Sequence, residues 1–262
     1  MLSRCIATLT FLSISSLFAG HYSMALRGDT TKFDYTEKNS NGLLDTEKTN
    51  YGNINGLTLS IDPQYHGFYS RVSTSKGDTD YVGGTNLNPT YGSYRTTTTN
   101  TLTNYELGYK VTIGESRNRL EVPVMVGIGY RRWLRQLHGT AGVSGYDELY
   151  DWGYYNFGIG LHYDFSSNIN LGVDASYRKA FNSQMHENFY GYTFDLKNVH
   201  GYTISVPLEL KLDQRWSILG MYNYEYWNIN ESNHIARGLL EIWEPDSETK
   251  NETFSLGLKY SF

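Results

Sequence analysis

Apolar side chains alternate strictly with polar or small side chains along several stretches of this chain, and this period of two constrains the fold more than any other feature. In residues 120–130 the even positions carry Leu, Val, Ile and Tyr, while the odd positions carry Glu, Pro, Met and two glycines. Residues 153–165, 169–178 and 202–212 follow the same pattern. Successive side chains of a strand point to opposite faces, so these stretches are predicted to be strands with one apolar face.

The composition argues against a large apolar core. Hydrophobic residues make up 39% of the 262 residues on a list that includes the 24 tyrosines, and charged residues make up 19%. A typical soluble domain is about 45–50% apolar and about 25% charged. The aromatic content of 15% argues against disorder, and the net charge of −5 argues against binding to nucleic acid. The length suits one domain or at most two.

The N-terminus has the features of a secretory signal peptide. Arg4 precedes an apolar stretch at residues 5–18, and Ser23-Met24-Ala25 fits the small-x-small cleavage rule. The apolar stretch is shorter than the about 20 residues of a membrane-spanning helix. We therefore predict a signal peptide over residues 1–25, with cleavage after Ala19 or Gly20 as the alternative, followed by one domain over residues 26–262. Removal of the signal would remove the single cysteine and exclude disulfides.

Ten strands are predicted, joined alternately by short turns and long loops. The long loops cover about residues 39–51, 75–101, 137–151, 182–198 and 231–251. Prolines fall inside two strands, at Pro123 and Pro207, and a β-bulge is expected at each. The predicted strands are residues 32–38, 52–62, 65–74, 103–114, 119–136, 152–165, 168–181, 199–212, 215–230 and 252–262.

This layout predicts an all-β protein, a single ten-stranded antiparallel transmembrane β-barrel in a bacterial outer membrane. Short periplasmic turns, long outer loops and an even strand number are typical of such barrels. Lipid explains the outward apolar face, and tyrosines at the two membrane interfaces explain the excess of tyrosine. The alternating tail from Phe254 to Phe262 resembles the C-terminal signature that the barrel assembly machinery reads. A soluble exported barrel or sandwich is the alternative.

The face opposite the lipid carries charges of both signs. Side chains of this kind can pair across a narrow lumen, because buried charges need partners. They predict either a stabilising plug of ion pairs or a narrow polar channel, and ten strands argue against an open general porin. The charged residues assigned to the lumen network are Glu106, Lys110, Glu121, Arg131, Asp174, Arg178, Glu209, Lys211, Glu225 and Lys259.

The ten strands, the five long outer loops and the LKYSF tail resemble the omptin family of outer-membrane proteases. That resemblance implies an Asp-x-Asp pair after strand 3 and an Asp-x-His pair after strand 7, which activate a water between them. Here Asp78 and Asp80 follow strand 3 and His186 follows strand 7, while Gln184 occupies the place of the second aspartate. Glutamine cannot ionise as a carboxylate does.

A second feature of the resemblance is contact with lipopolysaccharide. Tyr130 and Arg132 lie at the outer end of a strand and face outward by parity, where a guanidinium can bind a lipid phosphate. An interfacial arginine without a specific ligand is the alternative.

The first functional hypothesis is a non-enzymatic surface barrel, with a structural role or with adhesin-like loops that contact a host or environmental ligand. Apolar and aromatic residues in the last loop, among them Trp243, support it. An omptin-like endopeptidase and a narrow channel are the alternatives. The sequence indicates no cofactor and no metal site.

Overall fold

The computed structural model describes residues 22–85, 87–114, 119–140, 142–237 and 240–262. The first 21 residues of the predicted signal peptide lie outside the described residues. Among the residues that the structure describes, no helix is long and apolar enough to cross a membrane.

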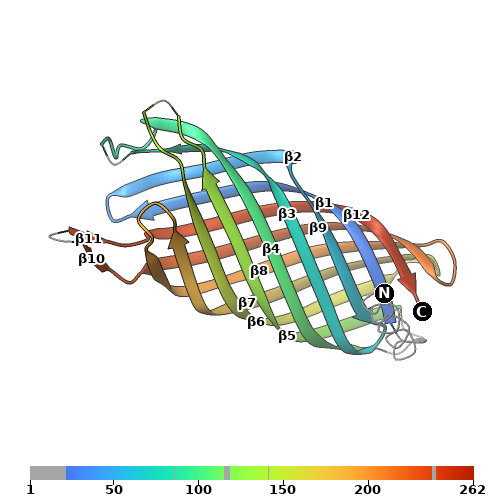
Figure 1. Ribbon diagram of the computed structural model, residues 1–262. Helices are drawn as coiled ribbons and strands as arrows, with labels where there is room; N and C mark the ends of the chain where they lie inside the picture. Colours follow the sequence, from blue (N-terminus) through green and yellow to red (C-terminus); the bar gives the residue numbers. More distant parts are fainter. Residues whose placement is uncertain (1–21, 86, 115–118, 141, 238–239) are drawn as a thin grey trace, which may run out of the picture.

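Ten antiparallel strands close into one barrel in the order β1-β12-β9-β8-β7-β6-β5-β4-β3-β2 (Figure 1). The fold class predicted from the alternation is therefore confirmed. A small hairpin between β9 and β12 forms a separate two-stranded sheet from β10 (Ile235–Arg237) and β11 (Leu240–Ile242). The barrel strands are β1 (Tyr22–Asn39), β2 (Gly42–Pro63), β3 (His66–Gly83), β4 (Tyr94–Ile113), β5 (Leu120–Leu137), β6 (Tyr146–Asp164), β7 (Ile169–Glu187), β8 (Thr193–Lys211), β9 (Trp216–Ser232) and β12 (Asp246–Ser261).

An apolar band surrounds the half of the barrel near the short turns, which we call the short-turn end. On β6 the outward residues Phe157, Ile159 and Leu161 are each more than half exposed, as lipid-facing side chains must be in the isolated chain. Tyrosines mark the upper edge of the band on successive strands. They are Tyr105, Tyr130, Tyr155, Tyr177 and Tyr202.

The strands continue past this band, so the segments predicted as long loops are mostly strand. Only Ser40 and Asn41 separate β1 from β2, and residues 188–192 separate β7 from β8. The prediction of long loops was wrong because the wall above the membrane has water outside it. Its outward face is therefore polar, and the contrast between faces that marked the lower strands disappears. Register shifts also concentrate in this outer half, for example between Asp151 and Gly153.

The bulges expected at the two strand prolines are absent. Pro123 pairs with Thr112 and Pro207 with Met221, each in unbroken register with its neighbours. On the side of the other neighbouring strand, the register is the same before and after each proline. There the pairing is missing only at the proline and at the residue before it. A proline has no N–H to donate, so a missing rung on one side is enough to accommodate it.

Replacing Ile159 by arginine is expected to lower the free energy of unfolding by about 2–4 kcal/mol, because this position lies near the middle of the apolar band. Unfolding by urea after refolding in lipid vesicles measures the effect. Thr101→Arg is the matched control, since Thr101 on β4 lies above Tyr105 and outside the band. Equal losses in the two variants would contradict the assignment of the membrane-spanning segment.

Candidate functional site in the barrel lumen

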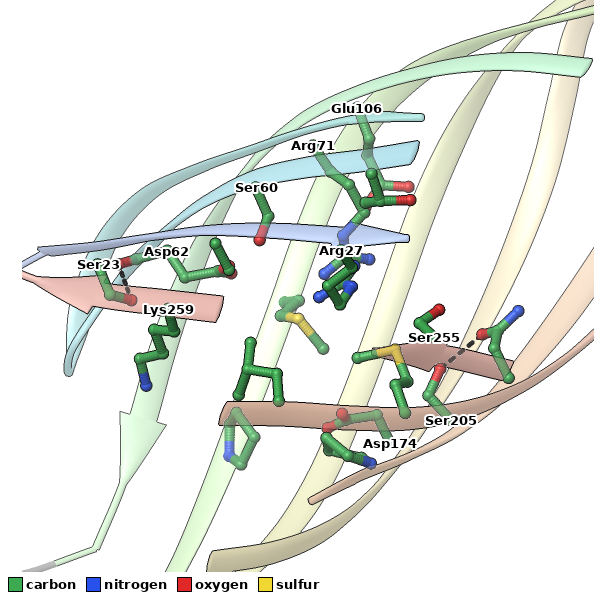
Figure 2. A pocket seen from close by; sticks show the side chains of 18 of the residues that line it. Ser23, Arg27, Ser60, Asp62, Arg71, Glu106, Asp174, Ser205, Ser255 and Lys259 are labelled. Carbon is green, nitrogen blue, oxygen red and sulfur yellow. Dashed lines mark hydrogen bonds between the residues drawn. The ribbon is translucent and has the colours of Figure 1, made fainter. Parts of the chain in front are cut away.

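A polar cavity of about 810 Å³ occupies the lower lumen. It opens at the short-turn end, where Gln64 and Gln214 line it, and it extends along the barrel axis toward the outer end as far as Arg131 and Glu225. Figure 2 shows that both basic and acidic side chains point into this cavity. Strand parity places all ten charged residues of the predicted network on its wall: Glu106, Lys110, Glu121, Arg131, Asp174, Arg178, Glu209, Lys211, Glu225 and Lys259.

Some of these charges pair within the cavity wall. Lys259 Nζ lies 2.7 Å from Glu209 Oε2. Asp174 binds His162, with 2.9 Å between Oδ1 and Nε2. Lys211 Nζ is 4.0 Å from Asp164 Oδ1. Among the described residues Glu121 and Lys110 have neither a hydrogen bond nor an ion pair, although both line the cavity.

An ion-pair layer closes the end of the cavity that lies farthest from the short turns. Glu225 on β9 accepts from Arg131 at 2.8 Å and from Arg178 at 2.7 Å. Arg178 also lies 3.6 Å from Glu106, which accepts hydrogen bonds from Tyr154 and two other side chains. The four charged residues come from β4, β5, β7 and β9, so the layer spans the lumen from wall to wall.

Aromatic side chains fill the lumen above the ion-pair layer. Trp152 and Trp227 pack with 5.1 Å between ring centroids, and the guanidinium of Arg131 lies over both rings. Trp133 stacks on Tyr150 at 4.8 Å. All four rings are at most 1% exposed. The described side chains therefore separate the cavity from the outer end of the barrel.

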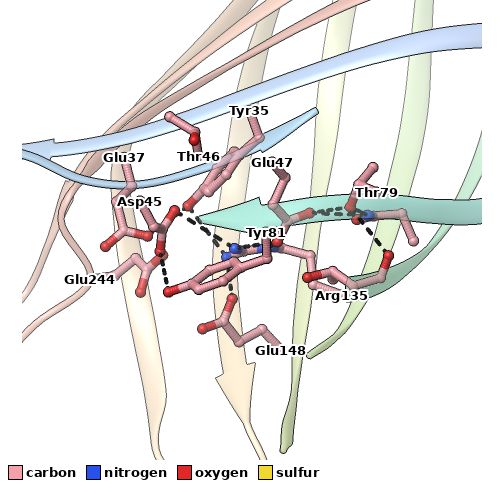
Figure 3. A network of polar contacts seen from close by, with 12 residues as sticks. Tyr35, Glu37, Asp45, Thr46, Glu47, Thr79, Tyr81, Arg135, Glu148 and Glu244 are labelled. Carbon is pink, nitrogen blue, oxygen red and sulfur yellow. Dashed lines mark hydrogen bonds and ion pairs between the residues drawn. The ribbon is translucent and has the colours of Figure 1, made fainter. Parts of the chain in front are cut away.

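A cluster of carboxylates around Arg135 forms the outermost layer, which we call the outer plug (Figure 3). Arg135 donates to Glu47 at 2.7 Å and to Glu148, and it lies 4.2 Å above the ring of Tyr35. Glu47 is fully buried and also accepts hydrogen bonds from Thr79 and Asn100. The remaining acids of the outer plug are Glu37, Asp45 and Glu244.

The outer plug holds five carboxyl groups, and Arg135 is the only cation that pairs with any of them among the described residues. Burial and the nearby Glu148 carboxylate raise the pKa of Glu244 to about 8, and burial and Glu244 raise the pKa of the half-buried Glu37 to about 8. These two acids are therefore mostly protonated at neutral pH. Tyr150 donates to Glu244, which ties the segment after β11 to the barrel wall.

The residues predicted as an omptin-like site do not meet. Asp78 and Asp80 lie within β3 rather than in a loop, and they face outward, while their neighbours Thr79 and Tyr81 point into the lumen. His186 lies on β7 and also faces outward, 3.6 Å from Asp151. Because Asp78, Asp80 and His186 all point away from the lumen, the predicted arrangement around a shared water is not formed.

These side chains instead form hydrogen bonds with residues on neighbouring strands. Thr99 donates to Asp78 at 2.6 Å and also lies 2.8 Å from His138. His186 Nδ1 lies 2.8 Å from the hydroxyl of Thr193. Gln184 donates to Asp195. The sequence analysis assigned these residues to loops, and without the strand boundaries it could not give the direction in which their side chains point.

Tyr130 and Arg132 both face outward at the upper edge of the apolar band, as parity predicts. Arg132 pairs in register with Asp151 on β6, and no hydrogen bond or ion pair to another described side chain involves its guanidinium. The position suits a lipid headgroup.

No family model matches the sequence, and no curated protein sequence matches it significantly. Solved structures are similar to this chain to different degrees. The outer membrane protease OmpT from Escherichia coli has a TM-score of 0.62 at 13% identity, over 93% of this chain and 97% of that chain. The translocator domain of autotransporter NalP from Neisseria meningitidis gives 0.47 at 10% identity, covering 99% and 96%. Neisserial surface protein A (NspA) gives 0.34 at 12% identity, covering 91% and 97%.

The closed barrel and its apolar band define an outer-membrane β-barrel protein. Its ten-stranded layout is similar to that of the OmpT barrel, and at this level of identity the likeness concerns the fold alone.

Proposed function

We propose that this protein is a non-enzymatic outer-membrane surface barrel that contacts a ligand through its outer tips. The carrying observation is that exposed apolar and aromatic side chains gather on the outer connections, far from the lipid-facing band. Leu87 and Tyr91 lie between β3 and β4, Phe189 lies between β7 and β8, and Trp243 follows β11. Exposed apolar groups on loops held by a rigid scaffold are typical of binding surfaces.

Local contacts hold these tips in place. Glu187 accepts hydrogen bonds from the backbone N–H groups of Phe189, Tyr190 and Tyr192, which fixes the β7–β8 connection. Trp243 stacks on His234 with 4.7 Å between centroids, and His234 contacts two glutamates. A preformed aromatic surface loses little conformational entropy when a ligand binds.

The two alternatives have less support. A protease would need an ionisable pair on the lumen side, whereas Asp80 and His186 face outward on separate strands. A channel would need a continuous lumen, whereas the ion-pair layer, the aromatic layer and the outer plug fill it.

The test compares three readouts on the refolded protein. Binding to a panel of glycans and extracellular-matrix proteins is expected for at least one member, and Phe189→Ser with Trp243→Ser is expected to weaken that binding at least tenfold. Lys250→Ala, on the outer wall but away from the tips, is the matched control. We expect no single-channel conductance in a planar bilayer and no cleavage of fluorogenic peptides. Turnover that Asp80→Ala and His186→Ala both abolish would establish the protease instead, and steady conductance would establish the channel.

Three further parts of the proposal concern export and lipid. A secretory signal would be cleaved after Ala19 or Gly20, because β1 already begins at Tyr22 and Ser23 pairs with Ser261. Phe262 would serve recognition by the barrel assembly machinery. Tyr130 and Arg132 would contact lipopolysaccharide at the outer leaflet.

A further inference from the structure

Two arginines in the lower lumen lack the carboxylate partners that Arg131, Arg178 and Lys259 have. Arg27 on β1 and Arg71 on β3 both line the cavity, and they lie close enough to repel each other (Figure 2). Arg27 is only 6% exposed. Among the described residues neither guanidinium has a hydrogen bond or an ion pair, and the Nε atom of each is buried without a hydrogen-bond partner.

The wall around the two arginines is shaped for a small guest. On β2, the strand between them, the positions that pair in register with Arg27 and Arg71 carry the small side chains Thr58 and Ser60. On the other side of Arg27, a Cβ at Gly257 would lie 2.7 Å from the Arg27 Cα and Cγ atoms. Glycine at this position therefore allows Arg27 to pack closely against β12.

The acids nearby attract the two arginines, but among the described residues none of them forms a hydrogen bond or an ion pair with either guanidinium. Glu106 is already engaged by Arg178 and by three neutral donors, and Asp29 accepts from Thr58. Asp62 on β2 is the remaining neighbour, and no ion pair joins its carboxylate to either arginine. Two adjacent guanidinium groups with unused Nε donors are unfavourable when buried unless an anion joins them.

We propose that Arg27 and Arg71 form a binding site for a small phosphate-class oxyanion that enters from the short-turn end. Each guanidinium would present its Nε and one Nη to two oxygens of the anion, the bidentate arrangement that arginine favours with phosphate. The cavity of about 810 Å³ leaves room for a small organic group attached to the phosphate. This site is independent of the proposed binding at the outer tips.

The test uses the refolded barrel in a maltoside detergent, which carries no phosphate. Inorganic phosphate and glycerol phosphate are titrated at constant ionic strength against chloride, and the thermal transition and calorimetric binding are recorded. Both phosphates are expected to raise the transition temperature, because a ligand that binds only the folded state stabilises it. Arg27→Gln and Arg71→Gln are each expected to weaken binding about tenfold or more. Lys259→Gln, which removes a lumen cation paired to Glu209, is the matched control.

Asp62→Asn keeps the proposal falsifiable even if an arginine variant fails to refold. Removal of this competing carboxylate is expected to tighten phosphate binding. Weaker or unchanged binding in Asp62→Asn, equal effects of phosphate and chloride, or the same loss in Lys259→Gln as in Arg71→Gln would each overturn the site. A response to glycerol phosphate but not to inorganic phosphate would place the ligand among organic phosphates.

Discussion

Arg135→Met is expected to lower the free energy of unfolding by about 3–5 kcal/mol, the largest loss among the substitutions considered. Arg135 is 1% exposed, and its removal leaves the fully buried Glu47 and its neighbour Glu148 without a cation. Removing one partner of a buried ion pair leaves the other charge buried and unpaired. The resulting loss of stability is far larger than the net contribution of the intact pair. Urea unfolding in detergent micelles, followed by tryptophan fluorescence, measures the change.

Two variants make this result specific. Arg135→Lys keeps the charge but loses the planar fork that reaches both carboxylates, so an intermediate loss is expected. Lys250→Ala breaks a solvent-exposed pair with Glu248 at 3.0 Å and should leave the transition unchanged. An Arg135→Met protein as stable as the parent would show that the outer plug contributes nothing to the barrel.

The stability of the barrel is expected to fall by up to a few kcal/mol as the pH rises from about 5 to about 8, and then to level off. The folded-state pKa of Glu244 is about 8, well above the ordinary glutamate value of 4.5. Between these two values the folded chain holds a proton that the unfolded chain has released. The stabilisation is therefore fully present below the unfolded pKa and is lost as the pH rises through the folded one.

Glu244→Gln separates this effect from other titrations. The amide mimics the protonated acid, so the variant should lose much of the slope between pH 5 and pH 8. Glu37→Gln should lose a further part, because Glu37 also has a pKa of about 8. The groups that face Glu244 are Glu148, Arg135, Asp45, Tyr150 and Glu37. An unchanged slope in both variants would contradict the protonated plug.

The sequence predicted the lower barrel well because lipid imposes a simple rule there. Each outward residue must be apolar, so strand, face and register follow from alternation alone, as in residues 153–164 on β6. Above the band that rule ends. The outer parts of β2, β3 and β6 were therefore predicted as loops, although they are paired strand.

Prediction of the lumen residues also differed between the lower barrel and the part above the apolar band. Parity placed Arg131 and Arg178 toward the lumen, and the structure joins them through Glu225. Arg135 has the same parity as Arg131 on β5 and could have been assigned inward. Its partners Glu47 and Glu148 could not, because they lie in segments predicted as loops. Arg27 was missed because the predicted first strand began after it.

The closure of the barrel between β1 and β12 also determines how the chain must assemble. Every other wall contact joins strands that follow one another along the chain, or that only the β10–β11 hairpin separates. These hairpins can add one at a time, but the seam from Ser23↔Ser261 to Lys38↔Asp246 must wait for the last strand. Until then both edges expose unpaired backbone groups, which invite pairing with other chains. Seam formation, the contact of highest sequence separation, is therefore expected to set the rate at which this barrel matures.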